Sequence, residues 1–181
     1  SSDVCSSDLG KIEGGAFKKG DKVKLLPSGF RSTIKTIEIN GQNIQEAYSP
    51  MSVSVTLKDD LDISRGDMIV KENNVPIISQ DLDLMICWMD SADLKSRKKV
   101  IIKHTTNECL GMITEILYKL DINTLHSIKD FEDFKLNDIG RIKIRSSKPL
   151  FFDSYKKNRH TGSIILIDPN TNATIAAGMI I

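Results

Sequence analysis

The residues best suited to chemistry are scattered along the chain. His104, His126 and His160 are its three histidines, and they are so far apart in sequence that only folding could bring them together. His160 lies in a polar string, residues 158–162, of a composition typical of turns that expose their side chains. A solvated loop histidine is the simpler interpretation, and a contact with a partner is the alternative.

Neither the acidic residues nor the cysteines form a recognisable set of metal ligands. Three aspartates cluster within residues 59–62, but the glycine and the closing glutamate of an EF-hand loop are missing at the required spacing. Cys5, Cys87 and Cys109 are odd in number and show neither C-x-x-C nor C-x-x-H spacing. We therefore expect a solvated acidic turn, no disulfide and no metal site.

Phosphate-binding and hydrolytic motifs are also absent from the sequence. It contains no G-x-x-x-x-G-K-[ST] loop to hold the phosphates of a nucleotide, and no G-x-S-x-G, H-E-x-x-H or G-x-G-x-x-G string. We predict no catalytic residue and no cofactor-binding residue in this chain.

The charge of the chain is balanced, which argues against a nucleic-acid partner. Lysine and arginine number 25 against 24 aspartates and glutamates, for a formal charge of +1. Affinity for a phosphate backbone depends on a concentrated positive charge. Basic stretches at residues 95–99 and 156–159 have acidic residues nearby and fit ordinary solvated loops. The longest apolar run is only a few residues and no signal pattern begins the chain, so we expect no membrane association and a cytoplasmic location.

The sequence from Gly10 onward predicts short strands separated by turns. Strands are expected at residues 22–26, 33–39, 53–57 and 68–70, with turn chemistry at Gly20-Asp21, Pro27-Ser28-Gly29 and Asn40-Gly41 between them. The first nine residues contain a near-repeat and look foreign to the rest. Because no convincing helix separates the strands, the pattern favours a small antiparallel barrel.

A polar stretch ending at Pro76 suits a connection between two units. Beyond it, residues 81–88 alternate apolar and polar side chains, and further strands are expected at 100–102, 110–120, 140–145, 163–168 and 174–181. Apolar residues at three-residue spacing predict a short helix or 3₁₀ turn within residues 123–134. The fold class is therefore all-β, with two antiparallel β-barrels at 10–75 and 76–181 and a foreign-looking tail at 1–9.

Several strings in this order resemble one family. Leu26-Pro27-Ser28-Gly29 and residues 62–68 (DISRGDM) resemble the second domain of elongation-factor-Tu-like GTPases, and specifically the large GTPase subunit of bacterial sulfate adenylyltransferase. Residues 136–140 (LNDIG), 158–168 and 171–174 (TNAT) resemble the third domain of that subunit.

The resemblance implies that the two barrels are domains II and III of a regulatory subunit. In that complex a small catalytic subunit joins ATP and sulfate into adenosine 5′-phosphosulfate, and GTP hydrolysis drives the step. GTP and Mg²⁺ would be bound by an N-terminal GTPase domain, in place of which this sequence has the nonapeptide. We expect a C-terminal fragment that is inactive alone, whose partners are the small subunit and the GTPase domain, and whose first barrel could lack its first strand.

Arg65, Asp67, Arg159 and Thr161 are the candidate partner or interdomain contacts, because they lie in polar turns that match the motifs. The competing hypotheses are a translation-factor-like barrel module that binds tRNA or another protein, and a free-standing structural module.

Overall fold

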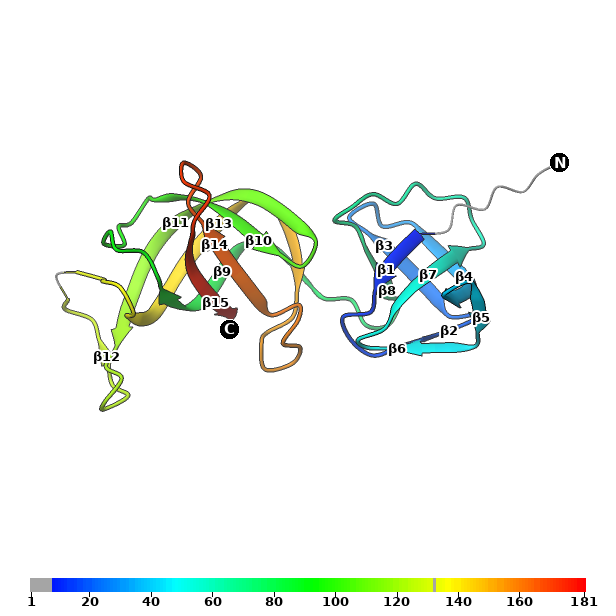
Figure 1. The fold of residues 1–181 in the computed structure, drawn as a ribbon, viewed down its shortest axis with the longest axis horizontal. Coiled ribbons are helices and arrows are strands. Elements are labelled where there is room, and N and C mark those ends of the chain that lie inside the picture. The colour runs from blue at the N-terminus through cyan, green and yellow to red at the C-terminus, as the bar shows by residue number, and fades with distance from the viewer. Residues whose placement is uncertain (1–7, 132) are drawn as a thin grey trace. The chain divides into compact units, whose positions relative to one another are not determined.

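A computed structural model describes residues 8–131 and 133–181 (Figure 1). The chain divides into two compact units, the first ending at Pro76 and the second beginning at Ile77. All of the regular secondary structure in the described residues is strand, and every strand pair is antiparallel. The prediction of an all-β fold with two antiparallel barrels is confirmed. Within the described part of the chain, no helix has the length and apolar character needed to cross a membrane.

The described residues of the first unit form eight strands. They are β1 (Asp8–Lys11), β2 (Ala16–Lys18), β3 (Lys22–Leu26), β4 (Arg31–Ile39), β5 (Gln42–Ile44), β6 (Glu46–Tyr48), β7 (Ser52–Leu57) and β8 (Met68–Lys71). The main sheet follows the order β1-β7-β4-β3-β8, with β5 added to β4, while β2 and β6 pair separately. Asn40 and Gly41 both have positive φ angles, as the two-residue turn of the β4–β5 hairpin requires.

The core of the first unit comes from residues that alternate along these strands. Val23, Ile34, Ile37 and Val53 are each at most 3% exposed. Every second side chain of a strand faces the same side of the sheet, and the register shift between Ile34 and Thr36 lets both Ile34 and Ile37 face the core although they are three positions apart. The barrel therefore follows from the alternation that the sequence displays.

Strand β1 begins at Asp8, within the stretch of residues 1–9 that looked foreign to the rest of the sequence. Leu9 pairs with Ser54 and Gly10 pairs with Val53. Strands pair through backbone N–H and C=O groups, which every residue except proline supplies, so a polar low-complexity segment can still form an edge strand. Residues 1–7 lie outside the described residues. In the described part of the first unit, β1 and β8 end the sheet order without pairing with each other.

In the second unit, seven strands lie within residues 77–131 and 133–181. They are β9 (Ile77–Trp88), β10 (Lys99–His104), β11 (Asn107–Leu120), β12 (Ser127–Ile128), β13 (Ile139–Phe152), β14 (Ser163–Ile167) and β15 (Thr174–Ile180). Their order is β10-β14-β15-β9-β13-β11-β12, and β11 also pairs with β10. This extra pairing closes β10, β14, β15, β9, β13 and β11 into a ring, which leaves none of these six as an open edge.

The interior of the ring is a single apolar core. Leu84, Ile102, Ile113, Ile142 and Leu166 are each 0% exposed and come from β9, β10, β11, β13 and β14 in turn. Burying an apolar side chain of this size contributes roughly 1.5–3 kcal/mol each relative to exposure. The tightly packed barrel therefore holds in place the ends of the loops that connect its strands.

The predicted helix within residues 123–134 is wrong. The described residues there form turns and β12, and the Asp121 carboxylate accepts backbone N–H bonds from Asn123 (2.8 Å) and Thr124 (3.3 Å). Leu125 is 72% exposed and has a φ of 59°, a left-handed conformation that a helix cannot include. Three-residue spacing lacks the alternating three and four of a helical face, and only Phe134 of the apolar series is buried in the core. Residue 132 of this segment lies outside the described residues.

Candidate partner-binding site

The loop of residues 153–162 joins β13 to β14 and contains two of the four candidate contacts. Lys156, Lys157, Arg159 and His160 are exposed along it. The loop leaves the same end of the barrel as the β10–β11 hairpin, because antiparallel neighbours reverse direction at each turn. An exposed cationic segment thus protrudes from one end of the closed ring.

Backbone hydrogen bonds fix this loop to the end of β15. The N–H of Tyr155 donates to the carbonyl of Ile180 (2.8 Å), and the N–H of Ile180 donates to the carbonyl of Gly162 (2.8 Å). Within the loop, the N–H of Gly162 donates to the carbonyl of Asn158 (2.8 Å). A Cβ on Gly162 would lie 2.4 Å from both the backbone N and the Cα of Tyr155, so only glycine allows this approach.

Side chains inside the loop complete its shape. The Asn158 Oδ1 accepts from the N–H groups of His160 (2.9 Å) and Thr161 (3.4 Å). The Thr161 hydroxyl donates to Asp153 Oδ2 (3.1 Å), and Lys157 Nζ lies 2.7 Å from Asp153 Oδ1. Thr161 is 5% exposed, so its side chain acts on the loop and its effect on a partner would be indirect.

His104, the last residue of β10, connects the loop to the barrel through a hydrogen bond. Its ring is 1% exposed at the end of β10, and its Nε2 lies 2.7 Å from the carbonyl oxygen of Thr161. Because a carbonyl oxygen only accepts, Nε2 carries the hydrogen in this bond. The contact joins His104 to a backbone group 57 positions away in the sequence.

Arg65 and Asp67 lie in the first unit, in the loop between β7 and β8. The carboxylate of Asp67 accepts the N–H of Ser64 (2.9 Å), and the N–H of Asp67 donates to the carbonyl of Ser64 (2.9 Å). Gly66 has a φ of 102°, which glycine adopts readily. Arg65 is exposed, whereas Asp67 is half-buried and shapes the turn. The four candidates thus form two pairs, one in each unit.

The acidic cluster near residue 60 has a structural contact. The Ser32 hydroxyl donates to Asp59 Oδ2 (2.7 Å), which ties this loop to β4. Within residues 8–131 and 133–181, no group of three His, Cys, Asp or Glu side chains is arranged to hold a metal ion.

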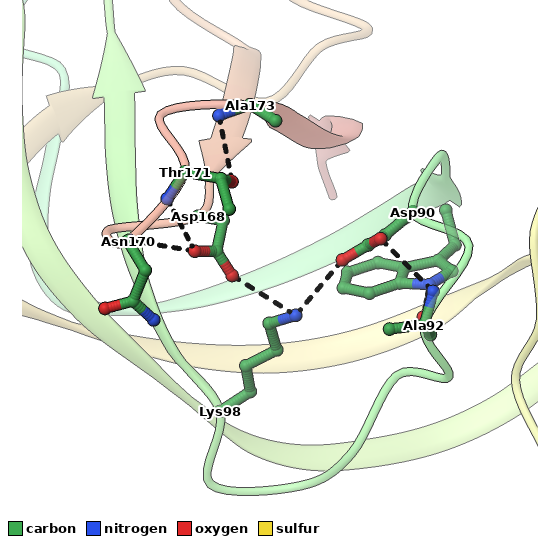
Figure 2. A network of polar contacts seen from close by, with 8 residues as sticks. Asp90, Ala92, Lys98, Asp168, Asn170, Thr171 and Ala173 are labelled. Carbon is green, nitrogen blue, oxygen red and sulfur yellow. Dashed lines mark hydrogen bonds and ion pairs between the residues drawn. The ribbon is translucent and has the colours of Figure 1, made fainter.

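A polar network at the other end of the second barrel was not predicted from the sequence. Figure 2 shows the Lys98 ammonium between two carboxylates, 3.3 Å from Asp90 Oδ2 and 3.5 Å from Asp168 Oδ2. The same ammonium lies 5.2 Å from the ring centroid of Trp88. The N–H of Asn170, followed by other N–H groups and Lys98, lowers the pKa of Asp168. The network joins the loop after β9 to the loop after β14.

Ion pairs cover the outward faces of β9, β13 and β11. Arg141 binds Asp83 through two hydrogen bonds, Nε to Oδ1 at 2.7 Å and Nη2 to Oδ2 at 2.6 Å, and Asp83 raises the pKa of Arg141 above its usual value. Two further pairs follow the same pattern: Arg145–Asp81 at 3.1 Å and Lys143–Glu115 at 2.9 Å. These three pairs are called the charge ladder below.

Comparison with known proteins places this barrel in a family. A family model described as GTP-eEF1A C-terminal domain-like matches residues 81–181. The chain belongs to the GTP-eEF1A C-terminal domain-like family. A crystal structure of Sup35 complexed with GDP matches 100% of this chain and 45% of that chain, with a TM-score of 0.86. At 18% sequence identity that likeness concerns the fold alone.

Relatives from bacteria are similar along almost the whole chain. The chain is 45% identical over 173 residues to sulfate adenylyltransferase subunit 1 of Bacteroides fragilis, covering 95% of this chain and 36% of that protein. It is also 45% identical over 176 residues to the bifunctional enzyme CysN/CysC of Mycobacterium tuberculosis, covering 97% of this chain and 29% of that protein. These similarities confirm the resemblance to the large subunit, although the chain spans only about a third of each relative's length.

Proposed function

We propose that the chain is a two-barrel scaffold within the GTPase regulatory subunit of a sulfate adenylyltransferase. The barrels support the GTP-driven formation of adenosine 5′-phosphosulfate from ATP and sulfate, and they carry no catalytic residue themselves. The observation that carries this proposal is the 45% identity to sulfate adenylyltransferase subunit 1 over 95% of the chain. We place the assembly in the cytoplasm.

The residues of the barrels do not fit GTP and Mg²⁺. The sequence has no G-x-x-x-x-G-K-[ST] loop, whose backbone amides and lysine would hold the phosphates. The proposal therefore assigns nucleotide and Mg²⁺ to a separate domain of the full-length subunit, and no chemical step passes through the barrels.

The proposed partner is the small catalytic subunit, with the two exposed turns as contacts. Arg159 stands on a loop that backbone bonds and Gly162 hold in one shape, and Arg65 stands on a turn capped by Asp67. A loop ordered before binding loses less conformational entropy when a partner docks. In this proposal Asp67 and Thr161 contribute by shaping these turns, and the arginines make the contacts.

Association with the cognate small subunit tests the proposal. The chain and the small subunit are mixed at micromolar concentrations and followed by isothermal titration calorimetry, with stable association as the expected result. No binding under these conditions would contradict the proposed function. Charge reversal by Arg159→Glu should weaken the complex, with Lys129→Glu, an exposed lysine beside β12, as the control. A tRNA affinity that falls steeply with salt would support the translation-factor alternative instead.

A further inference from the structure

Three neighbouring strands of the closed ring have an unusual composition. β10, β14 and β15 contain no aspartate or glutamate, and their only lysines are Lys99 and Lys103. A sheet face in contact with water normally carries polar side chains at every second position. The outward positions of these strands depart from that rule.

Strand register brings the outward apolar residues of this region together. Ile101 lies opposite Leu110, Ile165 lies opposite Ala177, and Met179 lies opposite Met85. These six residues are called the apolar face. Leu110 is 59% exposed, and Ile165 and Met179 are each 40% exposed. Contiguous exposed apolar residues on a protein surface mark interaction sites more often than isolated ones do.

The apolar face is continuous with the cationic loop. Met179 pairs with Ser163, and the Ser163 hydroxyl donates to the carbonyl oxygen of Arg159 (2.5 Å). On the other side, Lys103 lies directly opposite Ile165. Lys103 also lies opposite Glu108 on β11, where the charged part of the surface begins. The apolar face is therefore flanked by Lys103 on β10, which has Glu108 opposite it, and by the backbone of the loop that carries the exposed Arg159; these two residues are called the basic border below.

We propose that the apolar face and its basic border bind a segment of the partner subunit that presents apolar side chains next to carboxylates. This inference rests on the proposed function and names the surface that it uses. Interfaces commonly combine an apolar centre with a charged rim, and complementary charge in the rim selects the partner. Isoleucine and methionine side chains supply the centre, and the preformed loop supplies the rim.

Other occupants fit the surface less well. The balanced charge of +1 gives no field suited to nucleic acid. Proteins that lie on membranes insert aromatic side chains among basic ones, and the six residues of the apolar face include no aromatic side chain. A polypeptide segment is the occupant that matches both the apolar centre and the narrow basic border.

Substitution of the apolar face tests this inference. Ile165→Glu and Met179→Glu are made singly in the 181-residue chain, and binding to the small subunit is measured by calorimetry. A charge placed in the centre of the interface should weaken binding at least about tenfold. Ile128→Glu is the matched control, because Ile128 has nearly the same exposure (37%) but lies on β12, away from the apolar face. It should bind within about twofold of the wild-type chain.

The outcomes separate the two proposals. Wild-type binding that both variants retain would overturn the apolar face as the docking surface and leave the proposed function standing. Absence of wild-type binding would overturn the proposed function and this inference with it. Circular dichroism checks folding, and Leu110→Glu, at a position of the face that is 59% exposed, replaces a variant that does not fold. Apolar-face-dependent binding to phosphatidylserine vesicles, or to tRNA, would also count against a protein partner.

Discussion

The outer surface of the second barrel has two halves built on the same alternating strands. On β9, β13 and β11 the outward positions hold the charge ladder, whereas on β10, β14 and β15 they hold most of the apolar face. The inward positions of both halves are equally buried, as Ile142 and Leu166 show at 0% exposure each. The closed barrel therefore requires apolar residues at its inward positions and leaves the outward positions free to differ between the two halves.

The inward residues are determined by the packing of the barrel, whereas the outward residues depend on what the surface contacts, either water or another protein. Ion pairs on a surface add little stability but keep it soluble, since both members remain hydrated. Exposed isoleucine and methionine add neither packing nor solubility to an isolated barrel. Such residues make up most of the outward face of β14 and β15 and continue onto Met85 of β9 and Leu110 of β11, whereas the charge ladder lies on the rest of β9, β13 and β11, so we infer that the two halves meet different surroundings.

The largest expected loss of stability comes from truncating a large side chain in the core that both halves of the surface share. Trp88→Ala should destabilise the second barrel by about 3–5 kcal/mol, because Trp88 is 0% exposed and its Nε1 donates to the carbonyl of Ala92 (2.8 Å). Urea unfolding followed by circular dichroism measures the change. A loss below about 1 kcal/mol would mean that the core relaxes around the cavity.

A smaller effect is expected where the charge ladder is broken. Arg141→Met removes the two-bond pairing with Asp83, so the melting temperature should fall slightly at low salt, and the loss should shrink in about 1 M NaCl, where charges are screened. A double-mutant cycle with Asp83→Ser isolates the pair. A coupling that does not respond to salt would show that Arg141 acts through packing of its aliphatic stem.

Stability toward acid should depend on the Lys98 network. The pKa of Asp168 is lowered below 3.8 in the folded chain, so its ionised form stabilises folding above that pH. This contribution is lost as the pH falls through the lowered value, since the unfolded chain takes up the proton first. Asp168→Asn should therefore flatten the dependence of melting temperature on pH below about 4. Asp93→Asn, at an exposed carboxylate in the loop after β9, is the control.

The smallest expected effect concerns the apolar face in the isolated chain. The double variant Ile165→Ser, Met179→Ser should change the free energy of unfolding by no more than about 0.5 kcal/mol per site, because both side chains face solvent. Its retention on a hydrophobic-interaction column should fall. A large loss of stability would mean that these side chains support the barrel, and the contrast between the halves would disappear.

Most of the fold could be predicted because strand alternation is local. The alternation at residues 81–88 and the Asn40-Gly41 turn each lie within one short stretch of sequence. The helix predicted within 123–134 failed because the left-handed Leu125 and the turn at Asp121 override apolar spacing. The edge strand β1 was missed because its pairing with Val53 and Ser54 left no mark on its own composition.

The site was less accessible to prediction because its contacts join distant residues. Arg159 and Thr161 could be selected from a polar string, but nothing local shows that Thr161 is buried against His104. Lys98 meets Asp168 only through the pairing of β10 with β14, two strands that are distant in the sequence. The apolar face likewise depends on register, since Ile165 and Ala177 become neighbours through pairing of β14 with β15.

The place of β15 within the ring has a consequence for biosynthesis. Without residues 174–180, the remaining strands form an open sheet in the order β14-β10-β11-β13-β9, and its two free edges flank the gap that β15 fills. β15 is the C-terminal strand of the second unit, so a nascent chain cannot close the ring before residues 174–180 have been synthesised. The barrel is completed by insertion of that strand, so translation of residues 174–180 sets the earliest moment at which the second unit can reach its native state.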